Sequence, residues 1–293
     1  MEATCNWAYL YESLEDLADE ILLAHPLKVK AIASARIKTD KIDAGILAHL
    51  GRVDLVPCAW VPPRPVRDLR EVLRHRAFLV ALRTRLKNRI HATLTKLGIE
   101  HSFSDLFGKR GRQWLKTLQI REPFRQIIDQ DMRVIEALDD EILKLSQDIR
   151  ARAEITQEAK LLMTIYGIGE YSALLILAEI GEISRFPTPK HLVSYAGLCP
   201  STYQSGGIDR HGRITKQGSR WLRWILIEAT QKWAKRPGRL GDYYRRIAKK
   251  KGIKTARVAL AREILTAIFW MLKKGEVFRD CGGPAHPQIL LGS

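Results

Sequence analysis

The sequence predicts a mainly α-helical protein with a small α/β part, and three observations lead to this fold class. Apolar residues recur at intervals of three and four through most of the chain, which is the helical period. Two long stretches carry this pattern as a heptad seam, which predicts a coiled coil. Hydrophobic residues make up 46% of the 293 residues, enough to bury a sizeable core. We expect an α/β domain, a coiled-coil hairpin, a helical domain and a tail, at residues 1–65, 66–152, 153–275 and 276–293.

The α/β part is expected at the N-terminal end, where short apolar runs alternate with turn residues. An amphipathic helix is predicted near residues 7–20, followed by a short apolar strand at 21–24 and a turn at 25–26. A second helix is predicted at about residues 40–50. The proline-rich segment 61–65 cannot continue a helix and therefore predicts a linker.

The next part is expected to be an antiparallel coiled coil formed by two long helical arms. Gly98 and the segment 108–111 are expected to break the arms. The simplest role of such a hairpin is that of a spacer or a dimer contact. Its expected seam residues are Leu69, Leu73, Val80, Leu86, Ile90, Leu94 and Leu97 in the first arm and Ile128, Ile135, Leu138, Ile142, Leu145 and Ile149 in the second.

The chain is strongly basic, with 49 Lys and Arg against 32 Asp and Glu, a formal net charge of +17 and a pI of about 9.9. Most of the excess lies in residues 210–262, where 17 Lys or Arg occur with two acids, and a second basic stretch covers residues 67–100. Such an excess indicates a polyanionic partner, either nucleic acid or an anionic membrane surface. The membrane surface is less favoured because the cations are spread through expected loops as well as helices.

Several classes of protein are excluded by composition. No apolar run approaches the roughly 20 residues of a membrane span, and the N-terminus lacks the layout of a signal peptide. The cysteines lie far apart and form no CxxC pair, which excludes a disulfide scaffold and offers no zinc-site spacing. The expected location is the cytoplasm, without a membrane partner. The four cysteines are Cys5, Cys58, Cys199 and Cys281.

Two aspartates near the start of the second expected helix form a candidate metal site. Asp40 and Asp43 are three residues apart and would share one helix face. A hard divalent ion such as Mg²⁺ would relieve their repulsion by accepting carboxylate oxygens. The alternative is an ordinary acidic first turn with Thr39 as the N-cap. Glu2, before the first helix, is by itself only a capping residue.

A Gly-x-Gly turn between two apolar helical segments, at Gly167 and Gly169, is typical of a helix–hairpin–helix. Glycines permit the tight turn and allow backbone N–H groups to approach a phosphate at the start of the second helix. The dinucleotide-binding fingerprint is not met, because the third glycine and a suitable preceding strand are absent. The alternative is an ordinary turn between helices.

A candidate nucleophile, Ser205, precedes the glycine pair 206–207. The glycines would let a phosphodiester approach the hydroxyl, and nearby cations would stabilise the negative charge that develops on phosphorus. A serine hydroxyl needs a base or a metal for activation, and the alternative is a polar surface loop. The candidate phosphate contacts are Arg210, Arg213, Lys216 and Arg220.

Aromatic residues are interleaved with these cations. Trp221 and Trp224 are spaced to face the core, whereas Tyr243 and Tyr244 are candidates for stacking on bases.

Seven short motifs follow one another in a specific order along nearly the whole chain. Taken together, the ordered set resembles the Piv-like DEDD serine transposases and invertases of bacterial insertion sequences. The motifs are Met1-Glu2-Ala3-Thr4, residues 38–44, the arginine-rich 83–89, Tyr166-Gly167-Ile168-Gly169, and residues 195–200, 204–207 and 214–218.

The resemblance implies a RuvC-like, RNase-H-type N-terminal domain with four metal-binding acids and a helical domain with a serine nucleophile. By motif, Glu2 matches the second acid, Asp40 the third and Asp43 the fourth, and these three would bind Mg²⁺ or Mn²⁺. Ser205 matches the nucleophile. The family's first acid and early strands precede the position of Glu2, so we expect a partial, N-terminally truncated RuvC-like domain.

The predicted function is that of a DNA transposase or site-specific recombinase, with both Ser205 and metal acting on the scissile bond. The resemblance also implies a structured guide RNA, and the coiled coil favours a homo-oligomer, a dimer or tetramer. Two alternatives remain: a truncated, inactive relic that still binds nucleic acid, and a structural or membrane-surface protein. Further expected nucleic-acid contacts lie in the hairpin, at Arg85, Lys87 and Arg89.

Overall fold

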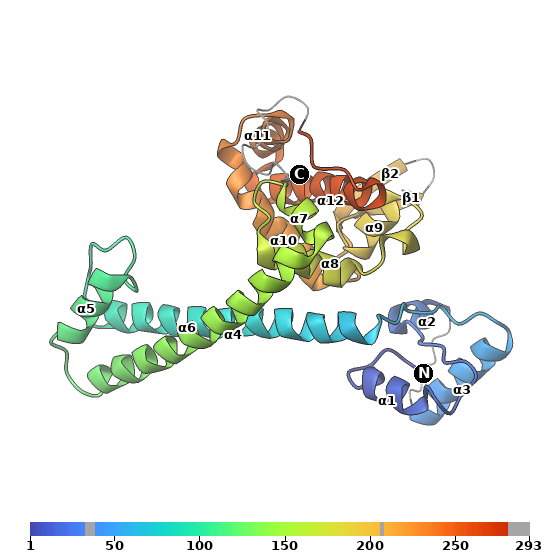
Figure 1. Ribbon diagram of the computed structural model, residues 1–293, viewed down its shortest axis with the longest axis horizontal. Coiled ribbons are helices and arrows are strands. Elements are labelled where there is room, and N and C mark those ends of the chain that lie inside the picture. The colour runs from blue at the N-terminus through green and yellow to red at the C-terminus, as the bar shows by residue number, and fades with distance from the viewer. Residues whose placement is uncertain (33–38, 206–207, 281–293) are drawn as a thin grey trace. The chain divides into compact units, whose positions relative to one another are not determined.

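The computed structural model describes residues 1–32, 39–205 and 208–280, except for the side chains of residues 31 and 202–211. It is mainly helical, as the sequence predicts (Figure 1). The chain divides into two compact units, the N-terminal unit of residues 1–64 and the C-terminal unit that begins at Pro65. The expected hairpin and helical domain fall within one unit. Of the expected tail, residues 276–280 are described, with Phe278 packed against the core, and residues 281–293 lie outside the described residues.

In its described residues, 1–32 and 39–64, the N-terminal unit holds three helices and a small set of backbone pairings centred on Ala24. Ala24 bridges Glu2 in a parallel sense and Cys58 in an antiparallel sense. A small core of Ala24, Val29 and Leu50 closes the unit. The helices are α1 (Trp7–Leu14), α2 (Pro26–Ile32) and α3 (Asp40–Arg52).

Three details of this unit differ from expectation. The first helix ends at Leu14 instead of residue 20, because the acids that follow oppose the negative end of the helix dipole. The segment 21–24 pairs through isolated bridges and forms no regular strand. Pro26 begins a helix where a turn was expected, since proline suits the first helical position. The helix expected at 40–50 is confirmed as α3.

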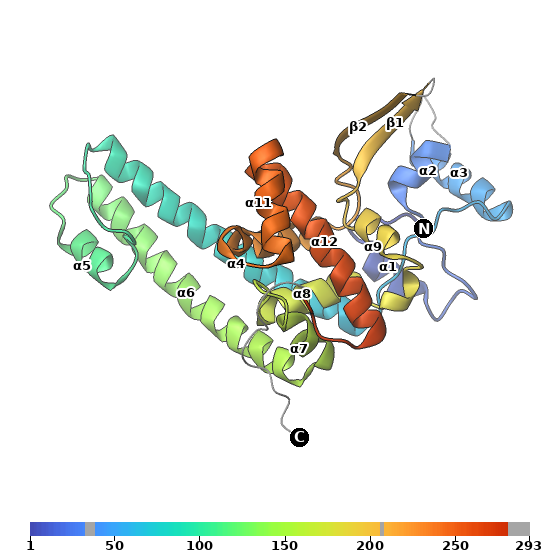
Figure 2. The same ribbon diagram turned by 90° about the horizontal axis from the view of Figure 1, so that it is seen from above.

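The C-terminal unit begins with two long antiparallel helices, α4 (Arg64–Lys96) and α6 (Phe124–Ile155). Their register is fixed by polar pairs across the seam: Arg76 Nε donates to Ser146 Oγ at 3.0 Å, and Arg83 lies 2.7 Å from Asp139. Helix α5 (Lys109–Thr117) lies at the end where the two arms are joined, as Figures 1 and 2 show.

Two predictions about the hairpin boundaries are wrong. The segment 61–65 is not wholly a linker, because α4 begins at Arg64; Pro65 is tolerated in the first turn, where its missing N–H would have no helical partner. The segment 108–111 does not break an arm. Gly108 precedes α5, and Gly111 lies inside it, packed so closely on the backbone of Leu106 that no side chain would fit.

The rest of the C-terminal unit packs helices around one apolar core, in which Leu175, Trp233 and Phe269 are fully buried. A two-stranded antiparallel ribbon, absent from the predicted helical domain, interrupts the helices and extends from the end of α9 (Figure 2). The elements are α7 (Gln157–Met163), α8 (Glu170–Ile180), η1 (Ile183–Arg185), α9 (Pro189–Tyr195), β1 (Pro200–Ser205), β2 (Ile208–Ile214), α10 (Arg220–Ala229), η2 (Thr230–Lys235), α11 (Arg239–Lys251) and α12 (Ile253–Lys274).

Asp139 links three helices of the hairpin, since its carboxylate accepts from Arg83 on α4 at 2.7 Å and from Arg112 on α5 at 2.6 Å. Burial alone would raise the pKa of Asp139, but the hydrogen bonds and charges of the two arginines outweigh it and lower the pKa below the ordinary value of 3.8. The stabilisation is therefore present at neutral pH and is lost as the pH falls through the lowered folded-state pKa.

We expect Asp139→Asn to lower the melting temperature at neutral pH and to have a smaller effect near about pH 3, where the wild-type carboxylate is also losing its charge. Thermal unfolding followed by circular dichroism at both pH values measures this difference. Asp140→Asn, at the exposed neighbouring position, is the matched control and should change neither value. An equal loss at both pH values would show that charge at Asp139 is not the cause.

Candidate catalytic ribbon and nucleic-acid interface

The ribbon is anchored at its base by the two segments that flank it, residues 195–200 and 214–219. Backbone N–H groups of the second segment donate to carbonyls of the first: Thr215 to Cys199 at 2.9 Å, Lys216 to Gly197 at 3.1 Å and Ser219 to Tyr195 at 3.1 Å. Two of the motifs singled out in the sequence therefore form one structural unit, the ribbon base.

Gly218 is required in the ribbon base for two reasons. Its φ of +76° is in the left-handed region, and a Cβ there would overlap the carbonyl oxygen of Tyr195. The close approach of the two segments thus depends on the absence of a side chain.

Below the ribbon base lies a buried carboxylate, Glu179 of α8, which is 1% exposed. Arg74 of α4 donates twice to Oε1, at 2.7 and 3.1 Å, and Ser219 Oγ donates to Oε2 at 2.8 Å. Ser219 also caps α10 by accepting from Leu222 N at 3.1 Å, and Tyr195 OH donates to the Glu179 carbonyl at 3.2 Å. Sequence reasoning missed this cluster, although a lone acid in the apolar run 173–180 was a signal of it.

Ser205 is the last residue of β1 and pairs with Ile208 at the end of the ribbon away from its base. Its side chain, and the following Gly206 and Gly207, lie outside the described residues. The ribbon therefore carries the backbone of Ser205 to its distal end, and the role of the hydroxyl stays a prediction.

The four candidate phosphate contacts are distributed along β2 and the segment after it. Arg210 pairs with Tyr203 across the ribbon, with its side chain outside the described residues. Arg213, Lys216 and Arg220 are exposed to solvent. Exposed cations from the ribbon to the start of α10 are available to a polyanion.

The two glycines between α7 and α8 differ in their surroundings. Gly167 has φ +89°, and a Cβ there would lie 2.5 Å from the carbonyl oxygen of Ala229, so packing against α10 already accounts for this glycine. Gly169, at the start of α8, is exposed and has open space around it. Glu170 follows in the first turn and lies 3.4 Å from Arg150. A role of either glycine in phosphate binding stays a prediction.

The predicted contacts on the hairpin also differ from one another. Arg85 is exposed, and Lys87 lies 4.9 Å from the ring centroid of Phe107. Arg89 forms an ion pair with the buried Asp131, and its Nε donates at 2.6 Å. Much of the Arg89 charge is thus compensated within the protein, so Arg85 is the freest of these three residues for nucleic acid.

The three predicted metal ligands all lie in the N-terminal unit. Asp40 and Asp43 occupy the first turn of α3, where Thr39 Oγ1 accepts from Ile42 N at 3.3 Å, as the N-cap alternative predicts. Glu2 lies on the segment that bridges Ala24. Within residues 1–32, 39–205 and 208–280, no three Asp, Glu, His or Cys form a group able to hold a metal. The Asp40–Asp43 pair fits Mg²⁺ in donor type, since this ion often takes one or two carboxylates with water and phosphate.

Among the described helices, none is long and apolar enough to cross a membrane.

Two models of transposase families match this chain. Residues 1–99 match the DEDD transposase model of IS110-type elements, and residues 159–245 match the model described as "Transposase IS116/IS110/IS902 family". The first match covers the N-terminal unit with Asp40 and Asp43, and the second covers the ribbon with Ser205. The class is that of the DEDD transposases, which implies the use of divalent metal. The chain belongs to the IS110/IS116/IS902 family of transposases, as the resemblance of its motifs predicts.

Three curated relatives show how far the similarity extends. A putative transposase of Sinorhizobium fredii is 26% identical over 79% of this chain, which spans 57% of that relative's length. The pilin gene-inverting protein of Moraxella bovis is 28% identical over 94% of this chain and 78% of its own length. The transposase for insertion sequence element IS1111A of Coxiella burnetii is 25% identical over 96% of this chain and 79% of its own length.

We expect Glu179→Gln to destabilise the C-terminal unit by about 2–3 kcal/mol, because it leaves the Arg74 guanidinium without its buried counter-charge. Urea denaturation followed by circular dichroism measures the loss. Glu154→Gln is the control, since this exposed residue lies 3.7 Å from Arg150 and should contribute nothing measurable. Equal stability of wild type and Glu179→Gln would contradict the importance of the buried cluster.

Substitution by alanine should change the stability of the protein differently at the two glycines of the α7–α8 turn. Gly167→Ala should lower stability by about 1–3 kcal/mol, because it combines a left-handed φ with a clash against the backbone of Ala229. Gly169→Ala should be nearly neutral, because nothing lies within 4 Å of the added methyl group. The same urea titrations compare the two variants, and the reverse order of stabilities would disprove the packing argument.

Proposed function

We propose that this chain is a DNA transposase or site-specific recombinase of an insertion sequence that cuts and rejoins DNA through Ser205. The observation that carries the proposal is the ribbon itself: a hydrogen-bonded base, exposed cations from β2 to the start of α10, and the backbone of Ser205 at the distal end, before two glycines in the sequence. Such an arrangement can present a hydroxyl to a phosphodiester while the cations hold the flanking phosphates.

In the proposed first step, Ser205 Oγ attacks a DNA phosphorus atom and loses its proton. The bond from phosphorus to one deoxyribose oxygen breaks, and that oxygen leaves as a hydroxyl once protonated. The product is a phosphodiester between the serine and the DNA end. Attack by the hydroxyl of another DNA end reverses the chemistry and rejoins the strands, so no external energy source is needed.

Arg213, Lys216 and Arg220 bind DNA phosphates in this proposal, and the ribbon base keeps these groups in register with Ser205. Asp40 and Asp43, with Glu2, are the residues that would hold Mg²⁺ or Mn²⁺. A bound divalent ion would polarise the phosphoryl oxygen and favour ionisation of the attacking hydroxyl. A structured guide RNA and further copies of this chain, in a dimer or tetramer, are the proposed partners besides DNA.

We expect Ser205→Ala to lower strand exchange by about 1,000-fold or more, because the covalent intermediate cannot form. DNA affinity should stay unchanged, since the phosphate contacts remain. Strand exchange is measured on a plasmid that carries the element's ends, and the covalent intermediate by denaturing electrophoresis with labelled DNA. Ser201→Ala, on the same strand, is the control and should retain the covalent complex. Recombination by Ser205→Ala would remove Ser205 from the proposed role.

A further inference from the structure

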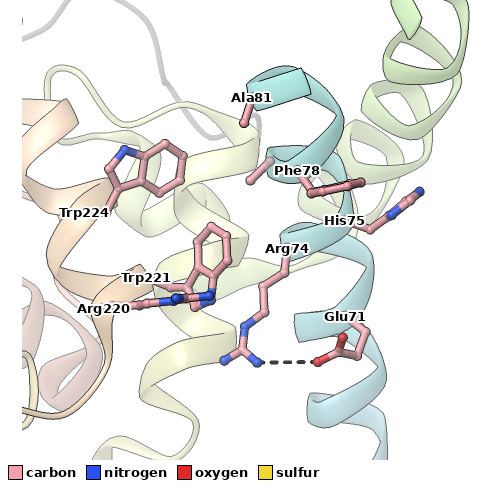
Figure 3. A pocket seen from close by; sticks show the side chains of 9 residues that line it. Glu71, Arg74, His75, Phe78, Ala81, Arg220, Trp221 and Trp224 are labelled. Atoms are coloured by element: carbon pink, nitrogen blue, oxygen red, sulfur yellow. Dashed lines mark hydrogen bonds and ion pairs between the residues drawn. The ribbon is translucent and has the colours of Figure 1, made fainter. Parts of the chain in front are cut away.

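A cavity of about 810 Å³ lies between α4 and α10 in the C-terminal unit, and of its lining residues the proposed reaction uses Arg220 alone, as a phosphate contact. Figure 3 shows α10 on one side, with Trp221 and Trp224 extending toward α4, and α4 on the other, with the rings of Phe78 and His75 extending away from the two tryptophans. The residues that the argument uses are His75, Phe78 and Ala81 of α4 and Arg220, Trp221 and Trp224 of α10.

Two of the aromatic side chains at this cavity are unusually exposed for their size. Phe78 is 53% exposed and Trp224 is 39% exposed. Trp221 packs partly against the core, with its ring 5.9 Å from that of Trp224. The prediction that both tryptophans face the core is therefore wrong for Trp224, since α10 presents it to the cavity instead. Exposed aromatic faces grouped around a cavity indicate a binding site.

The charges at the cavity narrow the choice of ligand. Arg220 lies 5.3 Å from the ring centroid of Trp221, and no described carboxylate pairs with it. Arg74, on the opposite wall, is already held by Glu179 and by Glu71 at 3.4 Å (Figure 3). One uncompensated cation beside exposed aromatic rings suits a flat aromatic group that carries a negative charge.

An unpaired nucleotide has both features, because its base has a π-face and its phosphate is anionic. A DNA duplex does not, since its bases are stacked and their faces are covered. A second copy of this chain suits Arg220 less well, because its formal net charge of +17 makes it a poorer source of negative charge than a nucleic-acid strand. Arg220 also begins α10 directly after Ser219, so a nucleotide bound here would lie beside the ribbon base.

We propose that the cavity between α4 and α10 binds an unpaired base of a nucleic-acid strand, stacked on Trp224, with its phosphate at Arg220. This inference rests on the proposed function, because that function supplies the nucleic-acid strand. The strand is either the DNA that the transposase acts on or the guide RNA, and the cavity would hold one of its bases outside a duplex. The chemistry is common to single-stranded DNA and to single-stranded RNA.

The test uses the full chain with Trp224→Ala and four labelled probes of equal length: oligodeoxythymidine, oligouridine, an abasic strand and a DNA duplex. Fluorescence anisotropy gives each affinity. Loss of one stacked base should weaken binding of a base-bearing single strand roughly 5- to 100-fold. The abasic strand and the duplex should bind as they do to wild type. The larger loss between the DNA and RNA probes identifies which strand occupies the cavity.

Two further variants make the result specific. Trp270→Ala is the matched control, because Trp270 on α12 is 45% exposed and has Lys274 5.7 Å from its ring, yet lies outside the cavity. It should leave all four affinities unchanged. Trp224→Leu should weaken binding of the same probes, because it keeps an apolar side chain but removes the aromatic ring, and it keeps the test open if Trp224→Ala fails to fold.

The inference is overturned if both cavity variants bind the single strands as wild type does. It is also overturned if they change only the oligomeric state in sedimentation, which would assign the cavity to a second copy. Either result, with duplex binding intact, leaves the proposed function standing. Failure of the wild-type chain to bind any probe would instead contradict the proposed function itself.

Discussion

The buried carboxylate of Glu179 is the interaction on which the C-terminal unit depends most. Burying a charged group away from water costs folding free energy unless the group is fully paired and hydrogen-bonded. Here Arg74 supplies two hydrogen bonds and Ser219 a third, so each oxygen has a partner. Because these residues lie on α8, on α4 and at the start of α10, satisfying one carboxylate fixes the relative positions of three helices.

This constraint extends to the ribbon through Ser219. The same residue donates its hydroxyl to Glu179, caps α10 and pairs its backbone N–H with Tyr195. The ribbon base is thereby fastened to the core, while Ser205 lies at the other end of the strands. A base fastened to the core is a suitable support for Ser205 in its proposed role as a nucleophile, because a reacting group is best held by well-packed elements.

The parts of the fold that the sequence predicted are those governed by local periodicity. Helix α3 and the two arms of the hairpin follow from apolar spacing, and the glycine turn before α8 follows from its residues. The ribbon could not be predicted in this way, because residues 200–205 are polar and do not alternate; their strand exists through pairing with 208–214.

Trp224 and Tyr244 show that helical spacing alone does not determine what a side chain faces. Their spacing is helical, but neighbouring elements decide that Trp224 lies at a cavity and that Tyr244, a candidate for base stacking, is buried.

Net charge predicted a polyanionic partner, but the structure shows that the two basic stretches are not equivalent. In the hairpin many arginines are used internally: Arg74 on Glu179, Arg83 on Asp139 and Arg89 on Asp131. In the helical region, by contrast, all three lysines at the end of α11, residues 249–251, are exposed. A count of cations therefore overestimates how much positive charge the hairpin can offer to nucleic acid. Because an arginine held in an ion pair has less charge to offer a phosphate, we expect the electrostatic attraction for DNA to come mainly from the ribbon base and from α11.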